Sequence, residues 1–124
     1  MVKIEAVIRP EKVNVVVDAL EKVGCGGFHL LNVTGRGNQK GIEIFVGRGT
    51  SSATRSSLPK TLVVTVVQDR DKDKVIEALI DANRTGEDGR IGDGKIFVSP
   101  VNEVVRVRTG EKNNKALWII IKKV

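Results

Sequence analysis

Hydrophobic residues recur along this chain with two spacings, and the spacing changes in a regular order. Residues 2–8 alternate apolar and polar positions, which predicts a strand. Pro10 suits a first helical turn, and apolar residues then return every three or four positions as far as Gly24. This predicts a helix that ends at the glycine. Residues 28–34 predict a second strand.

Residues 35–59 form a long connection rich in Gly, Ser, Thr and Arg, and connections of this length are usually functional. Residues 61–67 predict a third strand. Asp71 or Asp73 is expected to cap a second helix, whose predicted core face is Val75, Ile76, Leu79, Ile80 and Asn83. Further strands are expected at 95–99, 104–109 and 117–121. The order of elements predicts an α+β, ferredoxin-like βαββαβ sandwich.

Composition limits the class of protein. The 124 residues are 40% hydrophobic and 29% charged, as in one soluble globular domain. No apolar run reaches the length of a membrane span, and the first residues do not resemble a secretion signal, so we expect no direct membrane insertion. Cys25 is the only cysteine, which precludes an intrachain disulfide and favours a reducing, cytoplasmic location.

The formal net charge of +6 calls for an anionic partner. Aromatic residues make up only 3% of the chain, whereas proteins that bind single strands stack bases on several exposed aromatic side chains. The basic residues are also scattered. We therefore expect no nucleic-acid partner.

Three separated segments have the composition of anion-binding elements. The first, residues 84–100, carries glycines at 86, 89, 92 and 94, followed directly by Lys95. Glycine lets backbone N–H groups approach a ligand, and such a loop backed by lysine suits a phosphate. The others are residues 35–41 and 106–108. Three such elements in a small domain predict a polyphosphate ligand, hence a nucleotide.

Arg106 and Arg108 lie two apart on a predicted strand, so their side chains should leave one face about 7 Å apart. This spacing suits successive phosphates. The alternative is a solvated strand face.

The strand at 61–67 places apolar side chains on both of its faces. Two helices can cover only one face of such a sheet, so the other face needs a second cover. A neighbouring copy of the chain is favoured, and the alternative is that the apolar tail at 117–121 closes the face within one subunit.

Several blocks of the chain resemble, in order, the PII signal-transduction (nitrogen regulatory) proteins. Two are specific: Ile-Gly-Asp-Gly-Lys-Ile-Phe-Val at 91–98 and Arg-Val-Arg-Thr-Gly-Glu at 106–111. The others lie at 8–10, 35–41, 58–60 and 85–86. The resemblance implies a homotrimer of ferredoxin-like subunits. The chain would be one domain, 1–124, with a T-loop at 37–58, a B-loop at 85–95 and a C-terminal segment at 104–124.

In that family ATP and ADP compete for clefts between subunits, and 2-oxoglutarate often joins Mg-ATP there. The nucleotide residues implied here are His29, Gly35, Gly37, Asn38, Gln39, Lys60, Val66, Gly92, Asp93, Gly94, Lys95, Arg106 and Arg108. Those implied for 2-oxoglutarate are Gln39, Lys40, Gly41 and Lys60, with Gln39 also placing Mg²⁺. The alternative is that Gln39 and Lys60 only anchor the ends of the long loop.

The chain also departs from the family pattern. Asn38 stands where an arginine is common, and His29, expected to be a pocket-wall residue, replaces a small hydroxyl residue. The B-loop carries additional residues at 87–89. Tyrosine uridylylation, known in some members, is excluded because the chain has no tyrosine. Phosphorylation is an alternative use of the T-loop serines Ser51, Ser52, Ser56 and Ser57, which more often indicate only flexibility.

Arg48 resembles a T-loop arginine that some members insert into an ammonium channel. An ammonium transporter is therefore the favoured partner, with another transporter or a metabolic enzyme as the alternative. The favoured function is a regulator of nitrogen or energy status. The alternatives are a slow ATP-hydrolysing enzyme, with Asp93 or Glu111 as candidate base, or a sensor of another small molecule.

Overall fold

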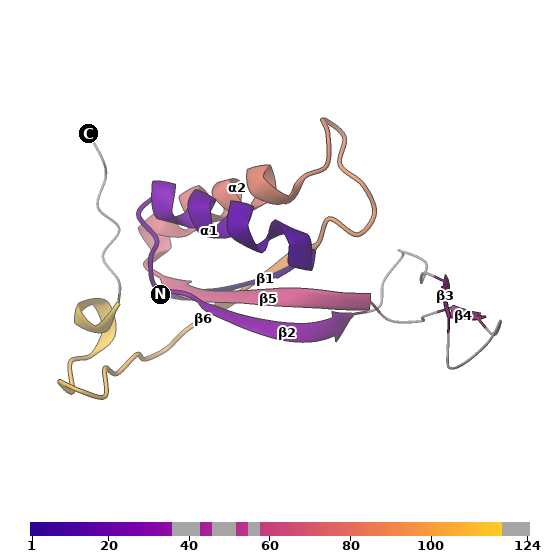
Figure 1. Ribbon diagram of the computed structural model, residues 1–124. Helices are drawn as coiled ribbons and strands as arrows, with labels where there is room; N and C mark the ends of the chain where they lie inside the picture. The colour runs from indigo at the N-terminus through magenta and orange to yellow at the C-terminus, as the bar shows by residue number, and fades with distance from the viewer. Residues whose placement is uncertain (36–42, 46–51, 55–57, 118–124) are drawn as a thin grey trace.

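Four antiparallel strands form the main sheet, in the order β2-β5-β1-β6 (Figure 1). The computed structural model describes residues 1–35, 43–45, 52–54 and 58–117. The strands are β1 (Val2–Ile8), β2 (His29–Gly35), β5 (Leu58–Val67) and β6 (Lys95–Pro100). With two helices on one face, this order is the predicted ferredoxin-like α+β arrangement.

Both helices, α1 (Val13–Lys22) and α2 (Lys72–Asn83), cover the same face of the sheet (Figure 1). Each follows a short 3-10 turn, η1 (Pro10–Lys12) or η2 (Asp69–Asp71). Within the described residues, no helix is long and apolar enough to cross a membrane. The core combines alternate strand positions with helix positions three or four apart: Ile4, Ala6, Ile8, Val16, Leu20, Cys25, Val63, Val67, Val75 and Leu79.

The end of α1 follows the prediction, whereas the start of α2 differs from it. Gly24 has φ of +83°, a backbone conformation that favours glycine, and it ends α1 as expected. The predicted aspartate cap is wrong. Asp71 precedes α2 without a side-chain cap bond, because η2 supplies the turn and the Asp71 N–H donates to Gln68 O at 3.0 Å. Asp73 lies inside the helix.

The predicted core face of the second helix is right for Val75, Leu79 and Asn83, which are buried. Ile76 is partly buried, and Ile80 remains 36% exposed, so Ile80 is not a core residue.

Strand limits around the long connection differ from the prediction. β5 begins at Leu58, three residues early, because Leu58 pairs with Gly35 and prolongs the ladder with β2. Two short strands inside the connection, β3 (Glu43–Phe45) and β4 (Ser52–Thr54), pair with each other.

The predicted strand at 104–109 is wrong. Val105 makes a single bridge with Lys112, and residues 107–109 form a turn between them. The Gly110 N–H donates to Arg106 O at 2.8 Å, which closes this turn. A 3-10 turn, η3 (Asn113–Ala116), follows. Of the predicted strand at 117–121, only Leu117 is described, and it is a bend.

The strand register separates the two segments that flank β6. Lys95 pairs with Val7 at one end of β1, and Pro100 pairs with Val2 at the other. At roughly 3.3 Å per residue, these ends lie about 17 Å apart. The glycine-rich loop before β6 and residues 101–117 after it therefore occupy opposite ends of the sheet (Figure 1).

The face of the sheet away from the helices is apolar and partly exposed. Leu31 is 49% exposed and Phe97 52% exposed there, beside the half-buried Leu62, Val64 and Val66. In the described part of the chain no helix covers this face (Figure 1). The predicted two-sided apolar strand is thus confirmed. Most of the tail that was the alternative cover, residues 118–124, lies outside the described residues.

We expect Gly94→Ala to destabilise the protein more than Gly86→Ala. At Gly94, φ is +120° and an added β-carbon would collide with the carbonyl oxygen of Val7. At Gly86, φ is +66° but nothing lies within 4 Å. The free energy of unfolding should fall by about 3 kcal/mol at Gly94 and about 1 kcal/mol at Gly86. Urea unfolding measures both, and equal losses would contradict the steric argument.

Candidate functional site

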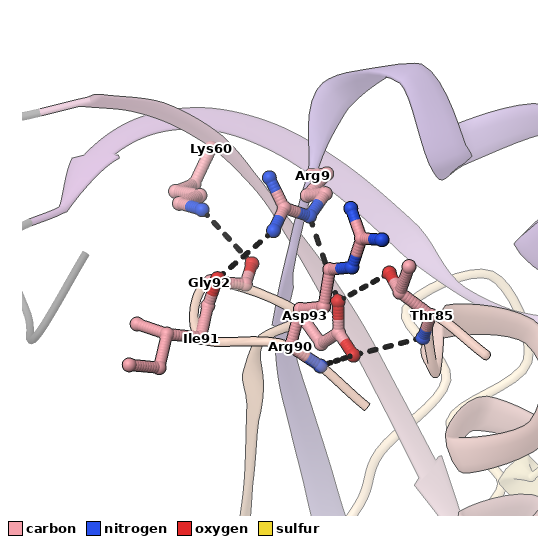
Figure 2. Close-up of polar contacts among 7 residues, drawn as sticks. All are labelled: Arg9, Lys60, Thr85, Arg90, Ile91, Gly92 and Asp93. Atoms are coloured by element: carbon pink, nitrogen blue, oxygen red, sulfur yellow. Dashed lines mark hydrogen bonds and ion pairs between the residues drawn. The ribbon is translucent and has the colours of Figure 1, made fainter. Parts of the chain in front are cut away.

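The carboxylate of Asp93 holds together the glycine-rich loop (Thr85–Gly94). Its Oδ2 accepts the backbone N–H of Thr85 at 2.9 Å and that of Arg90 at 2.8 Å, and its Oδ1 accepts the Thr85 hydroxyl at 2.6 Å (Figure 2). Arg9 Nε lies 3.7 Å from Oδ1. One side chain therefore fixes both the start and the middle of the loop.

These contacts decide the protonation state of Asp93. Burial alone would raise the pKa of the carboxyl, but the hydrogen bonds from Thr85 and Arg90 and the charge of Arg9 lower it to about 2. The group is therefore ionised at neutral pH. Because its oxygens are already engaged, Asp93 supports the loop from within.

Two cations hold the loop from outside. Arg9 donates from Nη2 to Ile91 O at 3.0 Å, and Lys60 donates from Nζ to Gly92 O at 3.1 Å (Figure 2). Burial and then the charge of Arg9 lower the pKa of the Lys60 ammonium, while Glu11 and Asp93 oppose the shift. Arg9 had no predicted role beyond its place in a family block. The sequence feature that could have indicated a role for Arg9 is its position directly after a strand and before a proline.

The loop glycines have backbone conformations that other residues rarely adopt. Gly89 has φ of +73°, Gly92 +98° and Gly94 +120°. Outside the sheet ladder, the described residues contain no hydrogen bond from the N–H of Gly92 or Gly94. Lys95 follows them with an exposed side chain. The loop thus presents N–H groups and a cation together, as the glycine pattern predicts.

The predicted site residues fall into two groups. Gly35 lies next to Lys60, since a β-carbon added at Gly35 would be 3.5 Å from Lys60 Cγ. Lys60 in turn contacts Gly92, so Gly35 and Lys60 lie near the glycine-rich loop. His29 and Val66 lie further along the sheet, paired with Val64 and Lys3. Outside the described residues lie Gly37, Asn38, Gln39, Lys40, Gly41 and Arg48.

Arg106 and Arg108 do not share a strand face, so the predicted two-residue clamp is wrong in this form. Arg106 precedes the turn and forms an ion pair with Glu111, with Nη1 2.9 Å from Oε1. Arg108 lies within the turn and is exposed. Both belong to the segment after β6, at the opposite end of the sheet from the glycine-rich loop.

The sequence profile described as Nitrogen regulatory protein P-II matches residues 1–111 of this chain. The chain belongs to the P-II family. Its relatives include Nitrogen regulatory protein P-II 2 of Methanothermobacter thermautotrophicus, 48% identical over 118 residues, covering 94% of this chain and 97% of the relative. Nitrogen regulatory protein P-II of Azospirillum brasilense is 45% identical, covering 94% of this chain and all of the relative.

The P-II relatives are named for regulation, and the chain is accordingly a nitrogen regulatory protein of this family rather than an enzyme. In the described part of the chain, no cluster of three His, Cys, Asp or Glu residues could hold a metal ion.

Asp93 is expected to make stability depend on pH. Its folded-state pKa of about 2 lies below the ordinary 3.8, so its contribution is complete above pH 4 and is lost as pH falls from about 4 to about 2. We expect a loss of about 1 kcal/mol after allowance for solvent screening. Denaturant unfolding across this range should show a flatter profile for Asp93→Asn, which is also less stable at pH 7.

The matched control is Asp88→Asn, an exposed carboxylate of the same loop. It should keep the wild-type pH profile. An unchanged profile in Asp93→Asn would show that another group carries the dependence.

Proposed function

We propose that this P-II protein binds ATP and ADP through the glycine-rich loop, with Mg²⁺ and 2-oxoglutarate as co-ligands, and reports nitrogen or energy status. The observation that carries the proposal is the pair of N–H groups at Gly92 and Gly94 beside the exposed Lys95. Backbone N–H groups and a lysine are a suitable set for phosphate oxygens. Lys60 and Arg9 add positive charge next to them.

The phosphate site in this proposal is completed by a second copy of the chain. The glycine-rich loop and the Arg106–Arg108 segment adjoin opposite ends of β6, about 17 Å apart, so one chain is not expected to bring both to one phosphate group. A neighbouring copy that packs on the open apolar face could supply the second segment. The family resemblance favours a homotrimer, in which each cleft takes its loop from one subunit and its arginines from the next.

Of the residues proposed to bind 2-oxoglutarate, Lys60 is the one that the structure describes. Its ammonium lies at the edge of the loop, where it could pair with a carboxylate of 2-oxoglutarate. Mg²⁺ would take most of its oxygen ligands from the phosphates and one from Gln39, which lies outside the described residues.

The regulatory output is proposed to pass through the T-loop, residues 37–58, to an ammonium transporter. Another transporter or a metabolic enzyme is the alternative partner. We place this activity in the cytoplasm, as the single cysteine suggests.

ATP hydrolysis receives little support from the candidate bases. The Asp93 oxygens are occupied by Thr85, Arg90 and Arg9, and a pKa of about 2 makes the carboxylate a poor proton acceptor. Glu111 is paired with Arg106. Phosphate release no greater than that of an Arg106→Ala control would exclude this alternative.

Calorimetric titration with ATP and ADP tests the central proposal. We expect both nucleotides to bind, and ATP with Mg²⁺ to bind about tenfold more tightly when 2-oxoglutarate is present, because the coupled ligands share Lys60. Lys95→Ala should weaken ATP binding by about tenfold or more, since it removes a charge-assisted contact. Lys112→Ala, which removes an exposed lysine, is the control. An absence of nucleotide binding would overturn the proposal.

Mixed assemblies test where the cleft lies. Lys95→Ala and Arg108→Ala should each remove tight sites when purified alone. Co-assembled in equal amounts, they should regain about one quarter of the sites, because some clefts combine an intact loop with an intact arginine. A cleft built within one chain would regain none. Native mass spectrometry confirms the mixing, and calorimetry counts the sites.

A further inference from the structure

A cleft of about 700 Å³ lies between α2, β6 and the glycine-rich loop. Its walls are apolar and include Ile76 and Ile80 from α2 and Ile96 and Val98 from β6. Ile96 and Val98 pair with Ala6 and Ile4, so the cleft lies on the side of the sheet that the helices cover. The volume is within the range of small-molecule sites.

The glycine-rich loop closes one end of the cleft with Asp88, Gly89, Arg90 and Ile91. Asp88 and Gly89 belong to the additional residues that distinguish this chain from the family pattern. Figure 1 shows the loop extending beyond the end of α2. Residues expected to be additional to the family pattern therefore form part of the cleft.

Asn83 provides a buried polar group in the wall of the cleft. The residue is 7% exposed, and its Nδ2 donates to Leu79 O at 2.7 Å. A carbonyl oxygen only accepts hydrogen bonds, so this contact fixes the amide orientation and directs Oδ1 elsewhere. Oδ1 is buried without a hydrogen-bond partner. Such an orphaned acceptor is costly, and a leucine at this core position would avoid the cost.

The charges that line the cleft favour an anion. Arg84, Arg90 and Lys95 contribute three cations, against the carboxylates of Asp88 and Asp93. Asp93 is already engaged by Arg9 and by hydrogen bonds within its loop. No ion pair of the three cations occurs among the described residues. The remaining charge is therefore positive.

We propose that this cleft binds a small amphipathic carboxylate with an N–H or O–H donor at its apolar end. The apolar body would lie between α2 and β6, and the carboxylate would face the basic residues at the rim. Asn83 lines the cleft, and its unpartnered Oδ1 would accept the hydrogen bond from the donor. A single water could satisfy Oδ1, but it fills only about 30 Å³ and would leave the apolar walls exposed.

This site is separate from the proposed nucleotide cleft. Gly35, Lys60, Arg106 and Arg108 do not line it. Lys60 and Val66 project on the opposite face of the sheet, since the intervening β5 residues Thr61, Val63 and Thr65 are the buried ones. The two sites share Asp93 and Gly94 at the end of the glycine-rich loop and Lys95 directly after it. Failure of nucleotide binding would leave the present proposal intact.

The test uses two probes, indole-3-acetate and 4-hydroxyphenylacetate, titrated into the full chain and followed by heteronuclear NMR and calorimetry. We expect shifts at the Asn83 side-chain amide and along α2 and β6. Ile80→Trp, which fills the cleft from a half-exposed position, should abolish these shifts. Val15→Trp on α1 is the matched control, because Val15 is 48% exposed and does not line the cleft.

Chemically matched probes test the two polar contacts. 1-Methylindole-3-acetate, which lacks the donor, and indole-3-acetamide, which lacks the charge, should each bind about tenfold more weakly than indole-3-acetate. In Asn83→Leu the preference for the free N–H should disappear while the preference for the carboxylate remains. Absence of binding by both initial probes, or equal binding to Ile80→Trp, would overturn the proposal.

Discussion

The pairing of β1 with its two neighbours is the constraint on which the candidate sites depend. Ile8 pairs with Thr61 on β5, and Val7 pairs with Lys95 on β6. This register brings the glycine-rich loop against Lys60 and places residues 101–117 at the far end of the sheet. The apolar core on the helix side fixes the register, because a shift by one residue would expose Ile4, Ala6 and Ile8.

The polar groups of the glycine-rich loop fall into two sets: those that hold the loop in shape and those that remain available to a ligand. Asp93 takes the N–H groups of Thr85 and Arg90, whereas Arg9 and Lys60 take carbonyl groups. The N–H groups of Gly92 and Gly94 are left outside this network. The loop is therefore shaped by its own side chain and two neighbours before any ligand arrives. Preorganised donors of this kind lose less entropy on binding an anion.

Short-range sequence patterns predicted the elements that depend on neighbouring residues. Alternation identified the first strand and a β-branched apolar run the strand at 61–67, and Gly24 and the helical spacing set the limits of α1. The arginine segment was misread because Val-Arg-Val-Arg alternates like a strand, whereas Gly110 at φ of +71° and the Arg106–Glu111 ion pair make a turn. The glycine pattern indicated the glycine-rich loop. It could not reveal that Asp93 and Arg9 shape it, because Arg9 reaches Ile91 across 82 positions of the sequence.

The hydrogen bond from Lys60 to Gly92 joins two segments that are 32 positions apart in the chain. Lys60 lies in β5, two residues after Leu58, where the long connection from β2 ends, and its ammonium contacts the glycine-rich loop. Any event that draws the ammonium away leaves the Gly92 carbonyl without its donor. Thermodynamic coupling is reciprocal. A change in the shape of the loop therefore alters the free energy of displacing the Lys60 ammonium by as much as that displacement alters the free energy of the loop. The contact thus couples the position of the Lys60 side chain to the shape of the glycine-rich loop.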